Sequence, residues 1–204
     1  MLNGNQPKYN NLMLARKLTT FFLDILEVVV FAIAIFLFTY LLVMQPHKIK
    51  GDSMQPNFPD GEYLLTDKIT YKVRKPQRGE VIVFIAPGTD DEEFIKRIIG
   101  LPGEKVKVEG GRVYLNGKIL DESYLSRSVI TSSGSFLKEG QEILVSDDNY
   151  LVFGDSRSAS SDSRIWGYVN LKKITGKAWL IYWPPQSAGL VEKVIYSFNY
   201  GSAH

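Results

Sequence analysis

An unbroken apolar stretch from Val28 to Met44 (VVVFAIAIFLFTYLLVM) constrains this chain more than any other feature. Its length lies at the short end of the roughly 17–25 residues that span a bilayer, and Phe21–Leu26 can extend it. Asp24 and Glu27 fall in this extension, where we expect them at the headgroup level or facing a partner. The stretch predicts a transmembrane anchor over residues 21–44. A buried core helix is the alternative, but such a helix needs neither this length nor this uniformity.

The flanks of the apolar stretch bear on its orientation and processing. Residues 1–20 are polar and contain three cations and no acidic residue: Lys8, Arg16 and Lys17. We expect them to form a flexible cytoplasmic tail, although Lys48 and Lys50 on the other side weaken the charge contrast. The segment after Met44 lacks the small residues of a signal-peptide cleavage site, so we expect an uncleaved anchor.

Beyond the anchor, residues 45–186 show the short, closely spaced apolar runs of an all-β domain. The expected strands are Val81–Ala86, Phe94–Ile99, Lys105–Glu109, Arg112–Leu115, Tyr150–Phe153 and Gly176–Trp183. Gly110-Gly111 and Asn116-Gly117 are hairpin signals. The pattern predicts a mainly β fold in which antiparallel sheets form a coiled barrel or sandwich after the single transmembrane helix. Residues 122–142 resemble a loop or small insertion.

The last segment, residues 187–204, is harder to interpret. Val191, Val194, Ile195 and Phe198 are spaced as one side of a short amphipathic helix would be. We assign no function to this tail.

Charge and composition exclude several classes of function. A formal net charge of +2 without a clustered basic run does not favour nucleic-acid binding. The chain has no cysteine, which excludes disulfides, thiolate catalysis and cysteine-bearing metal sites. It has two histidines, His47 beside the apolar stretch and His204 at the last position. Neither position favours a Ser-His-Asp triad.

A serine and a lysine are therefore the candidate catalytic pair. A serine hydroxyl is a poor nucleophile without a neighbouring base, and lysine is the other base that proteins use with serine. Ser53 follows the anchor closely in Lys50-Gly51-Asp52-Ser53-Met54-Gln55-Pro56, and Lys96 lies between apolar residues in Phe94–Ile99. On a strand, Phe94, Lys96 and Ile98 would share one face, and Arg97 would point to the other. An ordinary lysine has a pKa near 10.4, and burial can lower it by roughly 3–5 units.

Four segments in register resemble the conserved boxes of bacterial type I signal peptidases, also called leader peptidases, a serine–lysine dyad family. The segments are Ser53–Pro56, Arg78–Phe84, Phe94–Glu104 (FIKRIIGLPGE) and Gly154–Gly167 (GDSRSASSDSRIWG). Their order and spacing match as well, so the likeness runs from the membrane segment to about Trp183.

The resemblance implies a function and a location. It implies a membrane-anchored endopeptidase that removes signal peptides from exported preproteins after small residues, without a metal or cofactor. The anchor would cross the bacterial plasma membrane once, with a cytoplasmic N-terminus and the catalytic domain on the outer face. Signal peptides and the lipid bilayer would be the partners. Nucleic acid would not be one, and the oligomeric state stays open.

The resemblance also assigns residues. Ser53 would be the nucleophile and Lys96 the base. Ser160 would orient the lysine, and Asp162 and Arg164 would form a supporting ion pair.

Stabilisation of the oxyanion would come from the Ser53 amide and a neighbouring donor. Some members of the family place a serine two residues before the nucleophile, and Gly51 stands there in this chain, so a backbone donor in the Gly51 region would replace it. Met54 and Ile95 are the candidate substrate-binding residues. The family often has Asp-Asn where this chain has Ser158-Ala159, so hydrogen bonding there can differ.

Two other classes of protein fit parts of the pattern. Autoproteases of the repressor-cleavage class also use serine and lysine and can share a Gly-Asp-Ser-Met segment, but they resemble DNA-binding regulators and lack a membrane anchor. A catalytically silent envelope protein that binds peptides on the same scaffold is the other alternative. An activity assay with a Ser53→Ala control separates the three.

Overall fold

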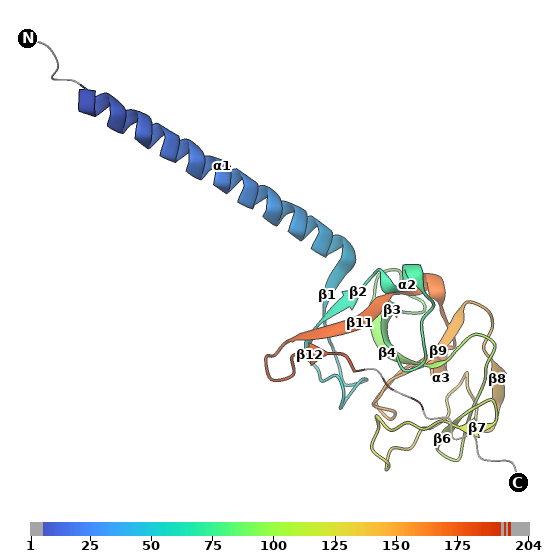
Figure 1. Cartoon of the computed structure of the whole chain (residues 1–204). Coiled ribbons are helices and arrows are strands. Elements are labelled where there is room, and N and C mark those ends of the chain that lie inside the picture. The colour runs from blue at the N-terminus through green and yellow to red at the C-terminus, as the bar shows by residue number, and fades with distance from the viewer. Residues whose placement is uncertain (1–5, 193, 195, 197–204) are drawn as a thin grey trace, which may run out of the picture. The chain divides into compact units, whose positions relative to one another are not determined.

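The computed structural model of this protein describes residues 6–192, 194 and 196, which divide between Val43 and Met44 into two compact units. The first unit contains α1 (Gln6–Val43), a single long helix (Figure 1). Residues 6–20 were expected to be a flexible tail, and instead they belong to this helix. Pro7 is the second residue of the helix, where proline is tolerated, and no glycine or proline follows it within α1, so helical hydrogen bonding extends over the rest of this stretch.

Residues 13–43 of α1 are long and apolar enough to cross a membrane, with an 18-residue window of mean hydropathy 2.7. None of that window is buried, which disfavours the alternative of a core helix. At 1.5 Å per residue these residues extend roughly 46 Å, more than the ~30 Å hydrocarbon core requires. Counted back from Val43, Glu27 and Asp24 lie roughly 24 Å and 28 Å along the axis, which suits carboxylates close to a headgroup region.

The second unit is a mainly β domain, and its antiparallel sheets confirm the predicted fold class. The larger sheet has the strand order β1-β2-β11-β3-β4-β9-β10, with β12 paired to β11, and the smaller has the order β7-β6-β5-β8. The strands of the larger sheet are β1 (Met44–Lys48), β2 (Tyr63–Asp67), β3 (Val81–Ile85), β4 (Glu93–Gly100), β9 (Asn149–Phe153), β10 (Val169–Asn170), β11 (Ile174–Trp183) and β12 (Gly189–Leu190). Those of the smaller sheet are β5 (Lys105–Glu109), β6 (Arg112–Leu115), β7 (Lys118–Ile119) and β8 (Glu142–Leu144).

Short helical segments lie between the strands. They are α2 (Thr70–Val73), α3 (Ser163–Trp166) and the 3-10 helix η1 (Leu171–Lys173). The Gly110-Gly111 and Asn116-Gly117 turns join β5 to β6 and β6 to β7, as their sequences predicted. Residues 122–141 form the expected loop, without a helix or strand of their own.

The central strands β3 and β4 are buried on both faces, because apolar residues alternate between separate clusters. Val81 and Val83 of β3 pack with Met54 and Phe58, whereas Ile82 and Phe84 pack on the other side of the strand. Figure 1 shows β3, β4 and β9 side by side in the domain. A strand enclosed in this way can hold a charged side chain such as Lys96 away from water.

Part of the C-terminal tail departs from the amphipathic helix that its spacing suggested. Gly189 and Leu190 form β12, pairing with Ile181 and Leu180 of β11. Val191 is not helical and packs against the cluster that contains Met54. A helix is disfavoured here because the segment gains backbone hydrogen bonds from an existing sheet. Ile195 and Phe198 lie outside the described residues.

Candidate active site

Ser53 lies in a compact turn between β1 and β2. Gly51 has φ +81°, a conformation that glycine adopts without a steric penalty. Met54 and Phe58 hold the turn in place, because their side chains pack in a core cluster and are only 1% and 4% exposed. The Phe58 amide also donates to the Met54 carbonyl at 3.0 Å. The nucleophile candidate therefore stands on a loop that is held by packing.

Lys96 in β4 reaches this serine. Its side chain is 4% exposed, and its Nζ lies 2.8 Å from Ser53 Oγ and 2.9 Å from the Ile95 carbonyl oxygen. Lys96 and Phe94 lie on the same face of β4, as expected, since Lys96 Nζ lies 5.3 Å from the centre of the Phe94 ring. Ser53 and Lys96 are 43 residues apart in sequence, and the fold brings them within hydrogen-bonding distance.

Burial lowers the pKa of Lys96 from 10.5 to about 8, against the opposing attraction of the Asp162 and Asp155 carboxylates. Removing the ammonium group from water disfavours its charged form, whereas nearby negative charges favour it. At pH 7 about a tenth of the molecules then carry a neutral lysine, compared with about one in three thousand for an unshifted one. A neutral Lys96 can accept the Ser53 proton.

This pKa predicts how activity depends on pH. Because the base must be neutral, kcat/KM for a peptide without titratable groups should rise about tenfold per pH unit below 8 and level off above it. Initial rates measured between pH 6 and 9.5 check this. A rate that is flat or falls as the pH rises through 8 contradicts the assignment of Lys96 as the base.

Gly154 directly follows β9 and allows the turn that carries Ser53, called the serine loop below, to approach the backbone closely. A β-carbon placed there would lie 2.3 Å from the Ser53 carbonyl oxygen and 2.2 Å from Ser160 Oγ. The Ser156 amide donates to the same Ser53 carbonyl at 3.1 Å. A residue larger than glycine at position 154 would displace the nucleophile loop.

Ser160, expected to orient the lysine, is close to the pair but not hydrogen-bonded to it. It is 8% exposed, and within the described part of the chain its Oγ has no hydrogen-bond partner. The hydrogen bonds of Lys96 Nζ are with Ser53 and Ile95. A buried hydroxyl without a partner is costly, and the expected hydrogen bond from Ser160 to Lys96 is not formed in this arrangement.

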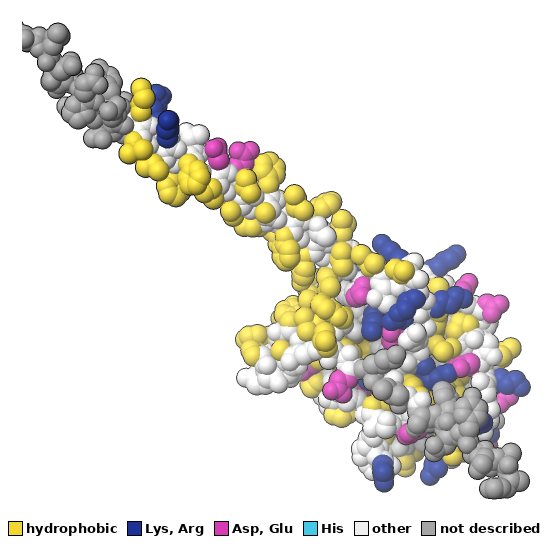
Figure 2. Space-filling model, viewed as in Figure 1, with side chains coloured by type: hydrophobic (Ala, Val, Ile, Leu, Met, Phe, Trp, Pro, Cys, Tyr) yellow, Lys and Arg dark blue, Asp and Glu magenta, His cyan; other side chains and the backbone are white. Residues whose placement is uncertain are grey.

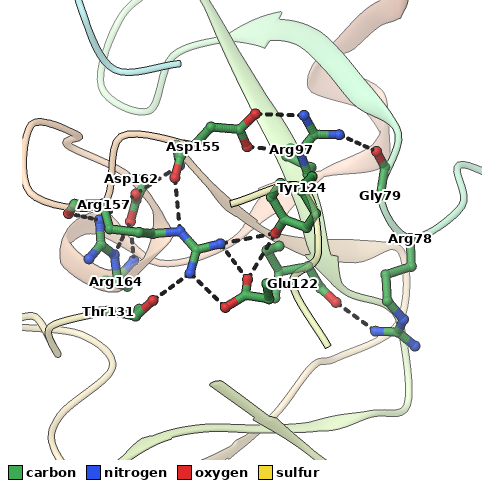
Figure 3. Close-up of polar contacts among 12 residues, drawn as sticks. Arg78, Gly79, Arg97, Glu122, Tyr124, Thr131, Asp155, Arg157, Asp162 and Arg164 are labelled. Atoms are coloured by element: carbon green, nitrogen blue, oxygen red, sulfur yellow. Dashed lines mark hydrogen bonds and ion pairs between the residues drawn. The ribbon is translucent and has the colours of Figure 1, made fainter. Parts of the chain in front are cut away.

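Asp162 and Arg164 form the expected ion pair. Arg164 Nε and Nη2 each lie 2.8 Å from an Asp162 carboxylate oxygen, and both side chains are buried (Figure 3). Asp162 Oδ2 also accepts from the Gly154 amide at 2.9 Å, and Arg164 Nη2 donates to the Arg157 carbonyl at 2.8 Å. The pair thereby holds the backbone beside the serine loop.

A second buried ion pair was not foreseen. Arg97 bonds Asp155 through two hydrogen bonds of 2.8 and 2.5 Å, and its Nη1 donates to the Gly79 carbonyl at 2.9 Å (Figure 3). Asn57, four residues after the nucleophile, donates to Asp155 Oδ2 at 2.8 Å. The Asp155 carboxylate thus links Asn57, which follows the nucleophile, to Arg97, the residue after Lys96.

A third arginine completes this network. Arg157 binds Glu122, the Tyr124 hydroxyl and the Thr131 hydroxyl (Figure 3). Arg157 is 3% exposed, so the loop of residues 122–141 is fastened to the segment that supports the dyad. Arg97 lies in the Phe94–Glu104 segment and Asp155 in the Gly154–Gly167 segment, so the sequence pointed to both regions. The pairing of the two residues has no local signature, because they are 58 residues apart.

A cleft of about 470 Å³ opens beside Ser53 and Lys96. Ile95 lines it, as expected for a substrate-binding residue. The assignment of Met54 was wrong, because its side chain is 1% exposed and packs in the core with Phe58 and Leu64. The residue after the nucleophile points inward to anchor the turn, so it does not line the cleft.

The oxyanion donors agree with the expectation only in part. In the described structure no protein acceptor binds the Ser53 amide, so it is free to donate to a developing oxyanion. The Gly51 amide instead donates to Asp60 Oδ1 at 2.7 Å. A backbone donor at Gly51 is therefore already engaged, and it would serve an oxyanion only after leaving Asp60.

His47 in β1 also lines the cleft, but it does not bond Ser53. Its Nδ1 lies 3.2 Å from Glu93 Oε2, and burial lowers its pKa against the attraction of Glu93. Its Nε2 is buried without a partner among the described residues. His204 lies outside the described residues. The geometry thus gives Ser53 a lysine neighbour, not a histidine.

A serine with a buried lysine partner in an antiparallel β domain is the arrangement of a serine hydrolase without histidine. The comparisons agree, since the family model described as signal peptidase, peptidase S26, matches residues 22–183. This chain belongs to that family and is a serine peptidase of the signal peptidase I type.

Two curated relatives support the same assignment. The chain is 40% identical over 154 residues to a probable signal peptidase I-2 of a Synechocystis species, covering 73% of this chain and 67% of the relative. It is 32% identical over 175 residues to signal peptidase IB of Staphylococcus aureus strain COL, covering 79% and 91%. A crystal structure of a signal peptidase I from Enterococcus faecalis V583 is 32% identical, with a TM-score of 0.43, and covers 51% of this chain and 97% of that one.

Proposed function

We propose that this protein is a membrane-anchored serine endopeptidase that cleaves N-terminal signal peptides from exported preproteins after small residues, with Ser53 and Lys96 as its dyad. The observation that carries the proposal is the 2.8 Å separation between Lys96 Nζ and Ser53 Oγ beside an open cleft. The names of its relatives supply the substrate class.

The chemistry follows from this pair. Neutral Lys96 accepts the Ser53 proton as Oγ attacks the scissile carbonyl, and the Ser53 amide stabilises the oxyanion that forms. Lysine then gives the proton to the leaving amine, and the C–N bond breaks to leave an acyl-serine. A water molecule, deprotonated by the same lysine, attacks the ester, and the lysine passes that proton to the departing Ser53 Oγ. This step releases the N-terminal fragment with its new C-terminal carboxylate and regenerates free Ser53.

In this reaction the acyl portion is the signal peptide, and the released amine is the new N-terminus of the exported protein. Ser160, Asp162 and Arg164 act as positioning residues. Asp162, paired with Arg164, accepts a hydrogen bond from the Gly154 amide, and Ser160 Oγ and the Ser53 carbonyl both lie close to that glycine. Ile95 contacts substrate, since it lines the cleft next to the base. No residue of this scheme needs a metal or cofactor.

The proposed location is the bacterial plasma membrane, crossed once by α1, with the N-terminus in the cytoplasm and the β domain outside. The basic flank with Lys8, Arg16 and Lys17 supports this orientation. Ser53 follows Met44 closely enough that an extended chain places it within roughly 30 Å of the end of the apolar helix. A signal peptide is held at the same surface, so enzyme and cleavage site share a plane.

The α1 helix argues against the repressor-cleavage class, which would carry a DNA-binding region at this end. The lowered pKa of Lys96 argues against a catalytically silent peptide-binding protein, because binding alone does not require a neutral lysine beside a serine.

The test is cleavage of a preprotein by the full chain reconstituted in vesicles. We expect one cut after an A-x-A-like sequence, identified by sequencing the new N-terminus, and no cut when the residue before the bond is a large aromatic one. A chain lacking residues 1–43 should cleave short soluble peptides but process vesicle-bound preprotein less efficiently. Intact preprotein after incubation with the wild-type chain overturns the proposed function.

A further inference from the structure

A cluster of lysines lies on the β domain around α2 and η1. The basic surface, as we call it, consists of Lys68, Lys72, Lys75, Lys172 and Lys173, contributed by α2 with its flanks and by η1. Tyr71 of α2 and Leu171 of η1 pack against the same core cluster, and α2 packs against β11, the strand that directly follows η1. In Figure 2 dark blue side chains gather over the part of the domain where Figure 1 places α2.

The charges of this surface are not neutralised by the protein. Among the described residues none of the five lysines has a carboxylate within 4.0 Å, whereas nearby Arg74 and Lys177 both pair with buried Glu80. Acidic groups also border this surface. The Asp67 carboxylate accepts hydrogen bonds from Ile69 and Thr70, Asp148 adjoins η1 through its backbone carbonyl, and Glu93 accepts a hydrogen bond from Thr175, two residues after Lys173. The surface keeps a positive excess, which attracts anions.

Two apolar side chains stand among these lysines. Val73 is 81% exposed and Ile69 is 38% exposed, both on or next to α2. Exposed apolar groups flanked by lysines are typical of segments that lie in the headgroup region of a membrane. A site for a small soluble anion would not need them.

The connectivity places this surface close to the end of α1. Val43, the last residue of the helix, is followed directly by Met44, which pairs with Asp67 across the β1–β2 ladder. Paired strands lie about 5 Å apart, and the chain from Asp67 to Thr70 adds at most about 10 Å. The start of α2 therefore lies within roughly 15 Å of Met44, whatever the tilt of the helix.

We propose that the basic surface binds the anionic lipid headgroups of the bilayer that α1 crosses, with Val73 inserted among them. This inference rests on the proposed membrane anchoring and adds a second, electrostatic attachment to it. A single covalent anchor leaves a domain free to rotate, and a tethered surface needs only a weak attraction to stay docked. Each lysine near an anionic surface favours docking by about fivefold.

The test uses the full chain with a fluorophore at position 73, the exposed valine of α2. Because the chain has no cysteine, Val73→Cys takes a polarity-sensitive probe at one position. One copy per nanodisc is compared in phosphatidylcholine and in a mixture with phosphatidylglycerol. We expect a blue shift in the anionic discs alone, and its loss in 1 M salt, where the screening length falls to about 3 Å. A probe on Ser126→Cys, in the 122–141 loop, should not shift.

A matched pair of charge variants gives the sharper comparison. Replacing the five lysines of the basic surface by glutamine should abolish the blue shift. The control replaces five cations around the smaller sheet by glutamine, namely Lys105, Arg112, Lys118, Arg127 and Lys138, and so lowers net charge equally. The control should keep the shift. If both variants lose it, net charge is responsible and the basic surface is not the docking site.

Two other results overturn the inference. An equal blue shift in phosphatidylcholine discs means that anionic headgroups are not recognised. A shift that requires two copies per disc, and not anionic lipid, assigns the surface to self-association. Cleavage of a soluble peptide in detergent is measured in parallel, so that an active enzyme without a lipid-dependent shift rejects this inference alone. Absence of cleavage rejects the proposed function and leaves the fluorescence result interpretable.

Discussion

Replacing Ser53 or Lys96 by alanine is expected to lower kcat for preprotein cleavage by at least about 10⁴-fold, and the double variant should be no worse than either single one. Residues that act as one catalytic unit show this non-additivity. Lys96→Arg should be as inactive as Lys96→Ala, because a guanidinium stays protonated and cannot accept the serine proton. Single-turnover rates with excess enzyme measure the chemical step.

Each variant must also be folded. We expect Ser53→Ala to unfold at the wild-type temperature, since the Ser53 side chain is half-buried and its hydroxyl bonds Lys96 alone among the described residues. Lys96→Met is the better folding control for the base, since it keeps the aliphatic side chain without the charge. Near-native turnover by folded Lys96→Ala would mean that another group removes the proton, and His47, which lines the same cleft, would be the first to examine.

Removing one partner of the Arg97–Asp155 pair is expected to lower the free energy of unfolding by about 3–5 kcal/mol, because it leaves the other charge buried and unpaired. Arg97 and Asp155 are 3% and 2% exposed. The combination of Arg97→Met with Asp155→Leu should cost less than either single change, since it leaves no unpaired charge. Urea unfolding of the detergent-solubilised full chain, followed by tryptophan fluorescence, measures these differences.

The Lys105–Glu142 pair is a matched control. Its partners lie 3.1 Å apart, but their side chains are 58% and 41% exposed. Removing Lys105 should change the unfolding free energy by less than about 1 kcal/mol, because water screens and solvates both charges. If Asp155→Ala were as mild as this control, the buried network would not determine the stability of the domain. Asn57→Ala, which keeps both charges, then shows how far the hydrogen bond to the serine loop affects kcat alone.

Local patterns predicted most of the longer strands. The hairpin of β5 and β6 was predicted to the residue, because side chains alternate strictly and Gly110-Gly111 marks the turn. β1 was missed, since Pro46 and three polar residues make up all of it after Met44, and its backbone partners come from β2. β8, β10 and β12 are short strands whose hydrogen bonds depend on neighbours distant in sequence. No periodicity is measurable over so few residues.

The candidate site divides in the same way. Ser53 and Lys96 were predicted from the motifs around them, but their separation of 2.8 Å required the fold. Met54 was misassigned because an apolar residue beside a nucleophile could face either the cleft or the core, and the turn directs it into the core. The use of Asp155 by both Arg97 and Asn57 could not be predicted, because three distant segments meet there.

The buried position of Lys96 has a consequence for the physiology of a cell that carries such a protein. With its pKa at about 8, the share of molecules ready to react falls from about half at pH 8 to roughly one in a hundred at pH 6. On the proposed topology the domain that contains Lys96 lies outside the cell, where the pH is not buffered by the cytoplasm. The rate at which exported proteins mature would then follow the acidity of the habitat, and a cell growing in acid would need more copies of the protein to sustain the same secretion.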